Sequence, residues 1–398
     1  MSRIAIWFPT LALAVSACGS GSVAGDGPTE TSDTDTDTDT DTDTDTDTDT
    51  DTDTDTDPTG VTDGIVDAFG KGQDFVTIGV AADGLERPRD LAFNPLNGAE
   101  LWTVNQDSDA TVTYFDPGEP SQTSERIKDP VLAEHFMEEV SSIAFGQEMG
   151  NEAVFATCQE SRNTYDDSAP ANDFMGPSLW PNSLSVYGVV VGDLGYHIDM
   201  LHQSPLCMGI EWDVDNAFWV FDGSAGNLVR YDFQDPHCIG CDDHSDGIVR
   251  RHTDVNLRRT PGVPSHLVLD RATGILYIAD TGNARVLAVD PSTAARVGNL
   301  NQFVEPLDEY TEWAGATVTE IVASGLSEPS GIALAGGVLF VSDHATGEIV
   351  AYDLVGTEIA RISVPDGPGI MGLEVGSDGK LWYVDGDHDL VVRIDPIP

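Results

Sequence analysis

The sequence is short of residues and motifs that several common function classes require. Its 398 residues include only three lysines, and 18 basic residues stand against 69 acidic ones, which gives a formal net charge of -51. A nucleic-acid binder, or a protein whose folded surface lies on anionic lipid, needs a basic face, so the composition excludes both. No Gly-x-Ser-x-Gly motif, phosphate loop or dinucleotide fingerprint is present, so neither generic nucleophilic chemistry nor nucleotide chemistry has support in the sequence.

Long apolar runs are also missing. The apolar run from Ile4 to Val15 follows Arg3 and is too short to span a bilayer, but it has the length of a signal-peptide core. It ends in Val15-Ser16-Ala17-Cys18-Gly19, which resembles the lipobox of bacterial lipoproteins. The resemblance implies that residues 1–17 are a signal peptide and that Cys18 carries lipid. Gly19 then favours the outer membrane or cell surface, and the alternative is an ordinary signal peptide with an incidental cysteine.

The segment after this cysteine is of low complexity. Residues 33–57 alternate strictly between aspartate and threonine and contain 13 aspartates and no apolar residue. Such a segment cannot offset the entropy of ordering, and repulsion between like charges extends it. We therefore expect residues 18–60 to be a disordered acidic linker. Residues 61–398 hold the remaining 54 acidic and 17 basic residues, so the predicted folded domain is itself strongly acidic.

A degenerate repeat begins after the linker. Each copy has a small or proline residue before an apolar strand, then a strand that usually ends in an acid or amide, then a third strand. The first strand recurs six times, at residues 88–93, 140–145, 207–212, 264–269, 329–334 and 370–375. Several short strands per repeat, with β-branched and aromatic residues in the strands and Gly, Asn and Asp in the turns, predict an all-β, six-bladed β-propeller of four-stranded antiparallel blades.

The last repeat stops before a fourth strand, whereas the segment at residues 75–80 has no partner of its own. We predict that it closes the ring as the missing outer strand, which removes an unpaired sheet edge. The segment Ile278-Ala279-Asp280-Thr281-Gly282-Asn283-Ala284-Arg285-Val286 resembles the NHL repeat. The resemblance implies a propeller of the NHL or TolB-like type. Propellers of that type include binding modules, gluconolactonase-type hydrolases and the zinc lyase of peptide amidation.

Four cysteines lie in the predicted domain. Cys158 follows the second strand of one blade and Cys207 opens the next blade, so both lie on one face of neighbouring blades and a disulfide is expected. Cys238 and Cys241 form either a short-loop disulfide or, with His237 and His244, part of a tetrahedral zinc site.

Three alternating carboxylates, Asp385, Asp387 and Asp389, follow the second strand of the last blade. Hard cations favour oxygen-rich turns, so these residues are a candidate calcium site. The alternative is a solvated polar turn, because no glutamate occupies the closing position of a twelve-residue calcium loop. No cofactor is assigned with certainty; calcium or another divalent metal is the candidate.

Propeller enzymes place their chemistry in the central tunnel, where the first strands lie. The candidates there are His266, Glu211, Glu374 and Arg89. A zinc lyase needs several converging histidines, and only His266 can be placed; a lactonase needs converging acids, which Glu211 and Glu374 could supply. The insertion between Cys158 and Ser183 carries aromatic residues and should lie at the tunnel mouth as a binding loop or a cover of the blade edge.

These features favour one function over another. The leading hypothesis is a monomeric cell-envelope lipoprotein that presents its propeller to a peptide, glycan or envelope partner, with membrane contact only through the lipid. The alternative is a metal-dependent hydrolase or lyase that acts in the tunnel.

Overall fold

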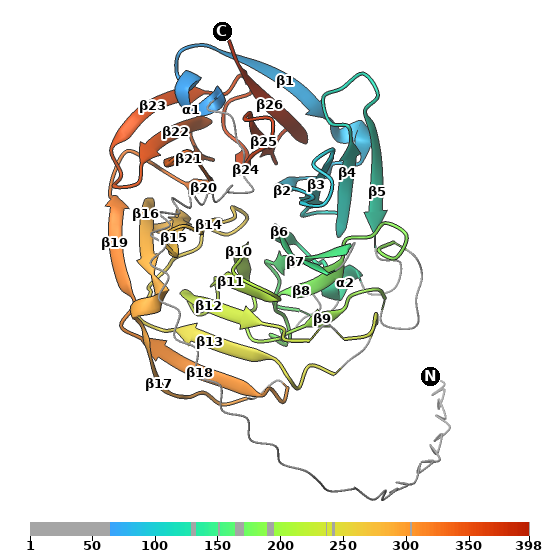
Figure 1. Cartoon of the computed structure of the whole chain (residues 1–398), viewed down its shortest axis with the longest axis vertical. Helices are drawn as coiled ribbons and strands as arrows, with labels where there is room; N and C mark the ends of the chain where they lie inside the picture. The colour runs from blue at the N-terminus through green and yellow to red at the C-terminus, as the bar shows by residue number, and fades with distance from the viewer. Residues whose placement is uncertain are drawn as a thin grey trace, which may run out of the picture. The chain divides into compact units, whose positions relative to one another are not determined.

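Six small sheets stand in a ring around a central axis in the computed structural model (Figure 1). The structure describes residues 64–128, 133–149, 152–163, 171–188, 195–235, 237–240, 243–302 and 305–397. The predicted signal peptide, Cys18, the linker and Cys241 lie outside the described residues. The chain is a six-bladed β-propeller, as the repeats predicted. No helix in the described part of the chain has the length and apolarity needed to cross a membrane.

The blades follow one another around the ring. Within each blade, successive strands lie progressively farther from the central axis. Blade 1 consists of β2 (Pro88–Phe93), β3 (Glu100–Asn105), β4 (Ala110–Phe115) and β5 (Thr123–Lys128). Blade 2 consists of β6 (Val140–Met149), β7 (Glu152–Gln159), β8 (Ser178–Pro181) and β9 (Asp199–Met200). Blade 3 begins with β10 (Cys207–Trp212), β11 (Ala217–Asp222), β12 (Asn227–Asp232) and β13 (Ile248–His252).

Blades 4, 5 and 6 complete the ring. Blade 4 consists of β14 (Leu267–Asp270), β15 (Ile275–Asp280), β16 (Arg285–Asp290) and β19 (Thr317–Val322). Blade 5 consists of β20 (Pro329–Ala335), β21 (Val338–Asp343), β22 (Glu348–Asp353) and β23 (Glu358–Ser363). Blade 6 consists of β24 (Ile370–Val375), β25 (Leu381–Asp385), β26 (Leu390–Pro396) and β1 (Gln73–Gly79). The short helices are α1 (Gly64–Ala68), α2 (Ala133–Phe136), η1 (Ala81–Asp83), η2 (Thr281–Asn283) and η3 (Pro291–Thr293).

The ring closes between the two ends of the domain. Strand β1 pairs antiparallel with β26, from Gln73 opposite Pro396 to Gly79 opposite Val391. This confirms the predicted closing strand. Burial follows the ring geometry: the second strands β11 and β21 are buried along their whole length, whereas the outer strands β5 and β17 (Ala295–Asn299) are mostly exposed. The second strands pack against the neighbouring blade on each side, so both of their faces are apolar.

Blade 3 carries two strands that the repeats did not predict. The chain leaves blade 4 after β16, forms the hairpin β17–β18 (Glu309–Ala314), and returns to blade 4 as β19. Strand β18 pairs in parallel with β13, from Ile248 opposite Glu309 to His252 opposite Trp313, and makes a six-stranded sheet. The hairpin therefore covers the outer edge of blade 3 and fastens blade 4 to it.

Alternating strand directions divide the loops between two faces of the ring. Loops from second to third strands, and loops between blades, open onto one face, which we call the upper face; the remaining turns open onto the lower face. Recurrent aspartates end several second strands at the upper face. Asp343 accepts hydrogen bonds from the backbone of Ser327 and Glu328, and Asp280 accepts one from Arg258. These residues hold the loops between blades through side-chain hydrogen bonds to the backbone.

Candidate functional site

The upper part of the tunnel is filled by polar side chains from equivalent positions of the first strands. Asp90 accepts hydrogen bonds from the Ser142 hydroxyl at 2.7 Å and from the Ile143 N–H at 3.0 Å. His266 Nδ1 lies 3.6 Å from Asp90, and its Nε2 lies 3.0 Å from the carbonyl oxygen of Ser141. All three side chains are buried. Because the serine hydroxyl pairs with the acid and not with the histidine, the arrangement is no serine–histidine nucleophile pair.

Glycines at the same position of the other three blades make room for these groups. A Cβ on Gly372 would lie 2.6 Å from Oδ1 of Asp90, and one on Gly331 would lie 2.1 Å from the Met371 carbonyl oxygen. A Cβ on Gly209 would lie 2.2 Å from the Ser265 carbonyl oxygen. The first strands can therefore approach closely only because these positions have no side chain.

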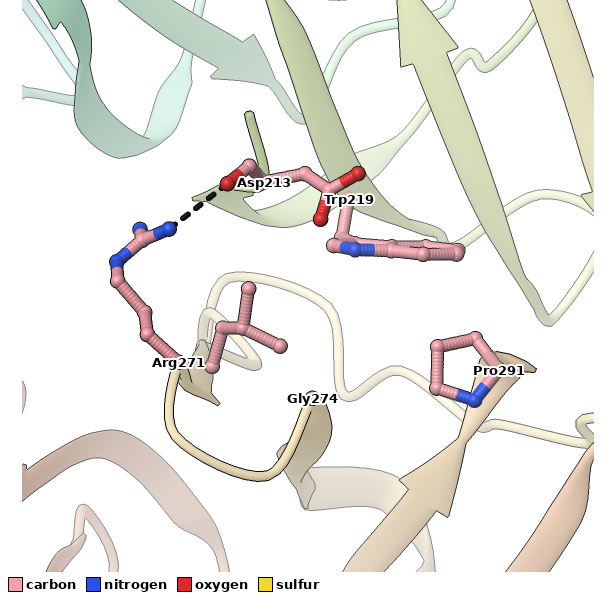
Figure 2. A pocket seen from close by; sticks show the side chains of 6 residues that line it. Asp213, Trp219, Arg271, Gly274 and Pro291 are labelled. Carbon is pink, nitrogen blue, oxygen red and sulfur yellow. Dashed lines mark hydrogen bonds between the residues drawn. The ribbon is translucent and has the colours of Figure 1, made fainter. Parts of the chain in front are cut away.

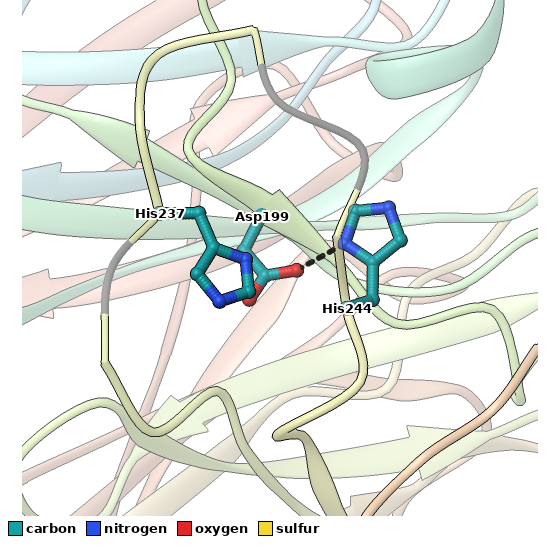
Figure 3. Close-up of side chains that lie close together, drawn as sticks. All are labelled: Asp199, His237 and His244. Carbon is teal, nitrogen blue, oxygen red and sulfur yellow. Dashed lines mark hydrogen bonds and ion pairs between the residues drawn. The ribbon is translucent and has the colours of Figure 1, made fainter. Parts of the chain in front are cut away.

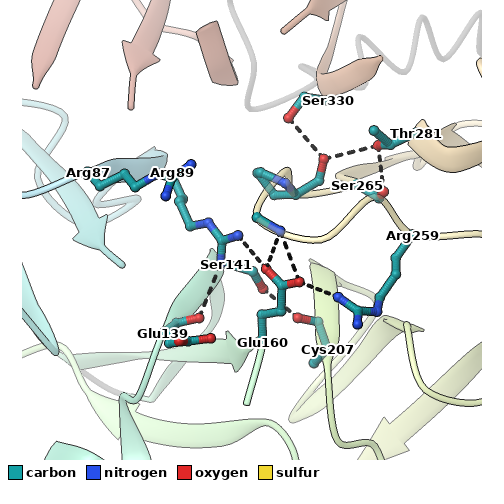
Figure 4. A network of polar contacts seen from close by, with 12 residues as sticks. Arg87, Arg89, Glu139, Ser141, Glu160, Cys207, Arg259, Ser265, Thr281 and Ser330 are labelled. Carbon is teal, nitrogen blue, oxygen red and sulfur yellow. Dashed lines mark hydrogen bonds and ion pairs between the residues drawn. The ribbon is translucent and has the colours of Figure 1, made fainter. Parts of the chain in front are cut away.

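A buried carboxylate ties three blades together at the upper mouth of the tunnel (Figure 4). Glu160, which follows β7, accepts hydrogen bonds from Arg89, from Arg259 at 2.5 Å, and from the Gly262 N–H at 3.1 Å. The Arg89 side chain is fully buried and that of Glu160 is 5% exposed. Arg89, a predicted site candidate, is therefore held in an ion pair inside the tunnel wall.

Acidic side chains line the lower part of the tunnel. Glu211 of β10 and Glu374 of β24 are half-buried and belong to blades 3 and 6, which are opposite in the ring. Burial raises the pKa of Glu211 to about 7, against the opposing effect of Arg271. Burial, together with the charges of Glu211 and Asp90, raises the pKa of Glu374 to about 8. The charge of Glu211 thus contributes to the raised pKa of Glu374, whereas His266 lies higher, beside Asp90. Within the described residues, the tunnel contributes no group of three metal-ligand side chains.

The raised pKa of Glu374 makes stability depend on pH. Between its unfolded pKa of 4.5 and about 8, the folded state keeps a proton that the unfolded state releases, so this residue lowers stability as pH rises. Glu374→Gln cannot titrate. We expect the melting temperature of the variant, relative to wild type, to increase progressively from pH 5 to pH 8.

The matched control is Glu358→Gln. The hydrogen bond from Arg361 lowers the pKa of Glu358, so it titrates below that range and its replacement should leave the pH profile unchanged. Parallel melting profiles for wild type and Glu374→Gln would show that Glu374 is already ionised in the folded state.

An open cleft of about 230 Å³ lies on the lower face between blades 3 and 4 (Figure 2). Its walls come from the turns that follow β10, β14 and β16 and from the second strand of blade 3. The lining residues are Asp213, Trp219, Leu269, Arg271, Gly274 and Pro291. The cleft therefore combines an indole with a carboxylate and a guanidinium.

Arg271 links this cleft to the tunnel. Its guanidinium donates to the carbonyl oxygens of Asp213 at 2.8 Å and Trp212 at 2.9 Å, and to Glu211 at 3.3 Å. It also stacks 4.2 Å from the ring centroid of Trp212. The side chain is nevertheless 46% exposed, so these contacts orient the guanidinium while leaving it open to solvent.

Trp219 offers an unused donor on the cleft wall. The side chain is 5% exposed, and its buried indole N–H has no hydrogen-bond partner among the described residues. An unsatisfied buried donor costs free energy. The indole nitrogen is closed to solvent, so a ligand acceptor recovers this cost only if the cleft wall opens around it. Sequence reasoning missed Asp213, Trp219 and Arg271, because Trp219 reads as an ordinary strand residue and the other two as turn residues.

The predicted cysteine and calcium residues have their own partners. Cys158 and Cys207 form the expected disulfide between blades 2 and 3. Cys238 is also disulfide-bonded. Asp385 accepts hydrogen bonds from the backbone of Asp387 and His388, and Asp389 accepts one from the Arg87 N–H at 2.7 Å. Asp387 lies 3.8 Å from both Arg87 and His344.

His237 and His244, and two aromatic residues of the insertion, contact the outer part of blade 2 or the residues that follow it. His237 and His244 lie on either side of Asp199, the outer strand residue of blade 2. In the insertion, Trp180 belongs to β8 and is buried, whereas Phe174 stacks on His202 with 3.8 Å between ring centroids. The insertion thus contributes a core strand as well as an upper-face loop.

Comparisons with known proteins support the fold. No protein-family model matches the chain, and no curated protein matches it. An auxiliary nutrient binding protein from Bacteroides thetaiotaomicron is similar in structure, with a TM-score of 0.54 and 12% identity over 81% of this chain and 76% of that one. A structural genomics protein of unknown function from the same organism is also similar, with a TM-score of 0.51 and 9% identity over 81% of this chain and 76% of that one. At these identities the likeness concerns the fold alone.

Proposed function

We propose that this propeller is a ligand-binding module and that the cleft between blades 3 and 4 is its binding site. The observation that carries the proposal is that Trp219, whose buried indole N–H has no hydrogen-bond partner among the described residues, lines one cleft with the exposed guanidinium of Arg271. Ligand sites combine apolar or aromatic walls with a few oriented polar groups, and this cleft has both. The tunnel groups near the upper face are, in contrast, engaged with one another.

The chemistry of the cleft favours a saccharide unit. An indole offers an apolar ring and a donor, while Asp213 and Arg271 offer an acceptor and fixed donors, which together suit a hydroxyl-rich ring. A volume of about 230 Å³ holds one such ring and leaves the rest of a chain outside. The similarity of this fold to that of an auxiliary nutrient binding protein from Bacteroides thetaiotaomicron supports a binding role.

Replacing Arg271 tests this site. Hydrogen bonds from a charged group contribute roughly 1.5–3 kcal/mol, so Arg271→Ala should weaken saccharide binding at least about tenfold. The measurement is isothermal titration of the saccharide that wild type retains most strongly from an immobilised panel, with a peptide panel run in parallel. Arg296→Ala, which removes an exposed arginine of the outer hairpin, should bind as wild type does. Equal affinities for wild type and Arg271→Ala would refute the assignment of the cleft.

We further propose that the module works in the cell envelope. The lipobox-like segment at Cys18 would attach the chain to lipid, and the acidic segment after it would hold the propeller away from the membrane. A flexible acidic linker extends the distance between the propeller and the membrane, and its negative charge does not bind anionic lipid. The propeller could then meet a glycan or another envelope component near the anchor.

A second candidate function, a metal-dependent hydrolase or lyase, is favoured by one observation in the tunnel. Asp90, Glu211 and Glu374 all have a raised pKa caused first by burial, and clusters of perturbed acids are common in active sites. This chemistry requires the ligand to enter the lower tunnel beside Glu211. Substitution of Glu374 would then abolish turnover without affecting binding in the cleft, which separates the two functions.

A further inference from the structure

Histidines and acids collect at the boundary between blades 2 and 3, outside both the tunnel and the cleft. They come from four separate segments: α2, the residues on either side of β9, the loop between β12 and β13, and the loop between β17 and β18. Five of the nine histidines lie here or contact this group: His135, His197, His202, His237 and His244. The sequence spreads them over more than a hundred residues, so only the fold brings them together.

Asp199 lies at the centre of one group of side chains that could bind a metal ion (Figure 3). Its carboxylate is fully buried, with His244 Nδ1 at 2.6 Å from Oδ1 and His237 Nδ1 at 3.8 Å from Oδ2. Single donor atoms of these three residues all lie within 4.8 Å of one another. Tetrahedral zinc with ligand distances near 2.0–2.2 Å places its ligands roughly 3.3 Å apart, so small side-chain movements suffice to enclose an ion.

Two atoms of this set are buried without hydrogen-bond partners in the described part of the chain. They are Oδ2 of Asp199 and Nδ1 of His237, and they face each other at a distance too long for a hydrogen bond. A buried carboxylate oxygen without a partner is costly. One cation between the two atoms would satisfy both. Asp246 lies 3.2 Å from Nε2 of His237 and can orient the ring, as carboxylates behind metal-binding histidines do.

The side chains of a neighbouring group of possible metal ligands already bind one another. His202, His244 and Glu305 also lie within 4.8 Å of one another. Here, however, Glu305 is 2.7 Å from both the backbone N–H and Nδ1 of His202, and Nε2 of His202 lies 3.3 Å from Nε2 of His135. These contacts leave fewer free donor atoms, so the set around Asp199 is the better cation site.

We propose that Asp199, His237 and His244 bind one divalent transition-metal ion, with zinc as the preferred ion. Two imidazoles and a carboxylate suit zinc, and they leave a fourth position for water or another ligand. The ion joins the outer strand of blade 2 to the loop between β12 and β13 of blade 3. It lies beside the contact between the Gly240 N–H and the His197 carbonyl oxygen, at 2.8 Å, which joins the same two segments.

The test is a zinc titration of the full chain after treatment with a chelator. We expect one tight equivalent of zinc, and we expect both His237→Ala and His244→Ala to weaken it at least about 100-fold. His344→Ala is the matched control, because His344 is half-buried at the upper face outside this cluster, and it should bind as wild type does. Cobalt in place of zinc should give the visible absorption of a four-coordinate site in wild type and in His344→Ala.

Two results would overturn the proposal. One is undiminished tight zinc binding by both His237→Ala and His244→Ala, and the other is the absence of a tight equivalent in wild type. If the variants fail to fold, X-ray absorption of zinc-loaded wild type decides the question. Two histidines around the ion would support the site, whereas a shell of oxygen alone would place the ion on carboxylates elsewhere in the chain.

Discussion

Glu160→Ala should lower the free energy of unfolding by roughly 3–5 kcal/mol, the range expected when one partner of a buried ion pair is removed. Arg89 is fully buried and depends on Glu160 for its charged partner, and Arg259 and the Gly262 N–H bind the same carboxylate. The variant therefore leaves a buried guanidinium without compensation and releases three segments at the upper mouth of the tunnel. Urea-induced unfolding followed by tryptophan fluorescence measures the loss.

The comparison variant for this effect is Glu320→Ala. Glu320 pairs with Arg285 at 2.9 Å, but its side chain is 42% exposed, and pairs of this kind contribute at most about 1 kcal/mol. We expect only a small change. If Glu160→Ala is no more destabilising than Glu320→Ala, then water reaches Arg89 and the tunnel wall is more open than the structure describes.

The second large effect concerns the disulfide between blades 2 and 3. Cys158 and Cys207 are separated by 49 residues, and closing a loop of that length restricts the unfolded chain. The double variant Cys158→Ala/Cys207→Ala should be less stable by about 2–4 kcal/mol. The measurement is the urea midpoint under oxidising conditions, so that the disulfide of Cys238 is retained.

Reductant gives an independent check on this disulfide. Reductant should lower the midpoint of wild type by more than it lowers that of the double variant, because only wild type has this bond to lose. An unchanged midpoint in the double variant would mean that packing alone holds the two blades together. Both cysteines are fully buried, so the bond is shielded from reductant until the blades open.

The sequence predicted the ring because each blade repeats a local pattern. The first strands recur with the same small or proline residue in front, and the turn aspartates recur at the upper face. The closing strand β1 was predicted because its segment had no partner nearby and the last blade lacked one strand. Both predictions follow from strand alternation, which short sequence segments show, and from the need to pair an open sheet edge. The disulfide was predicted from the same topology.

The site residues were less accessible to such reasoning because they meet only through the tertiary fold. Asp213 and Arg271 lie in turns of different blades, and the hairpin β17–β18 is an insertion without a repeat signature. His237 and His244 were noticed beside Cys238 and Cys241, but Asp199 lies far from them in the sequence and was not among the predicted site residues. The electrostatic coupling of Glu211 to Glu374 also depends on the ring having six blades, which places blades 3 and 6 opposite each other.

The indole N–H of Trp219 reports directly on ligand binding in the proposed site, the cleft between blades 3 and 4. In a two-dimensional NMR titration of the ¹⁵N-labelled chain with the retained saccharide, we expect the Trp219 indole resonance to shift in a saturable manner. The Trp382 indole, which lies in blade 6, should stay in place. A saturable shift confined to upper-face residues, with the Trp219 resonance unmoved at saturation, would contradict the account.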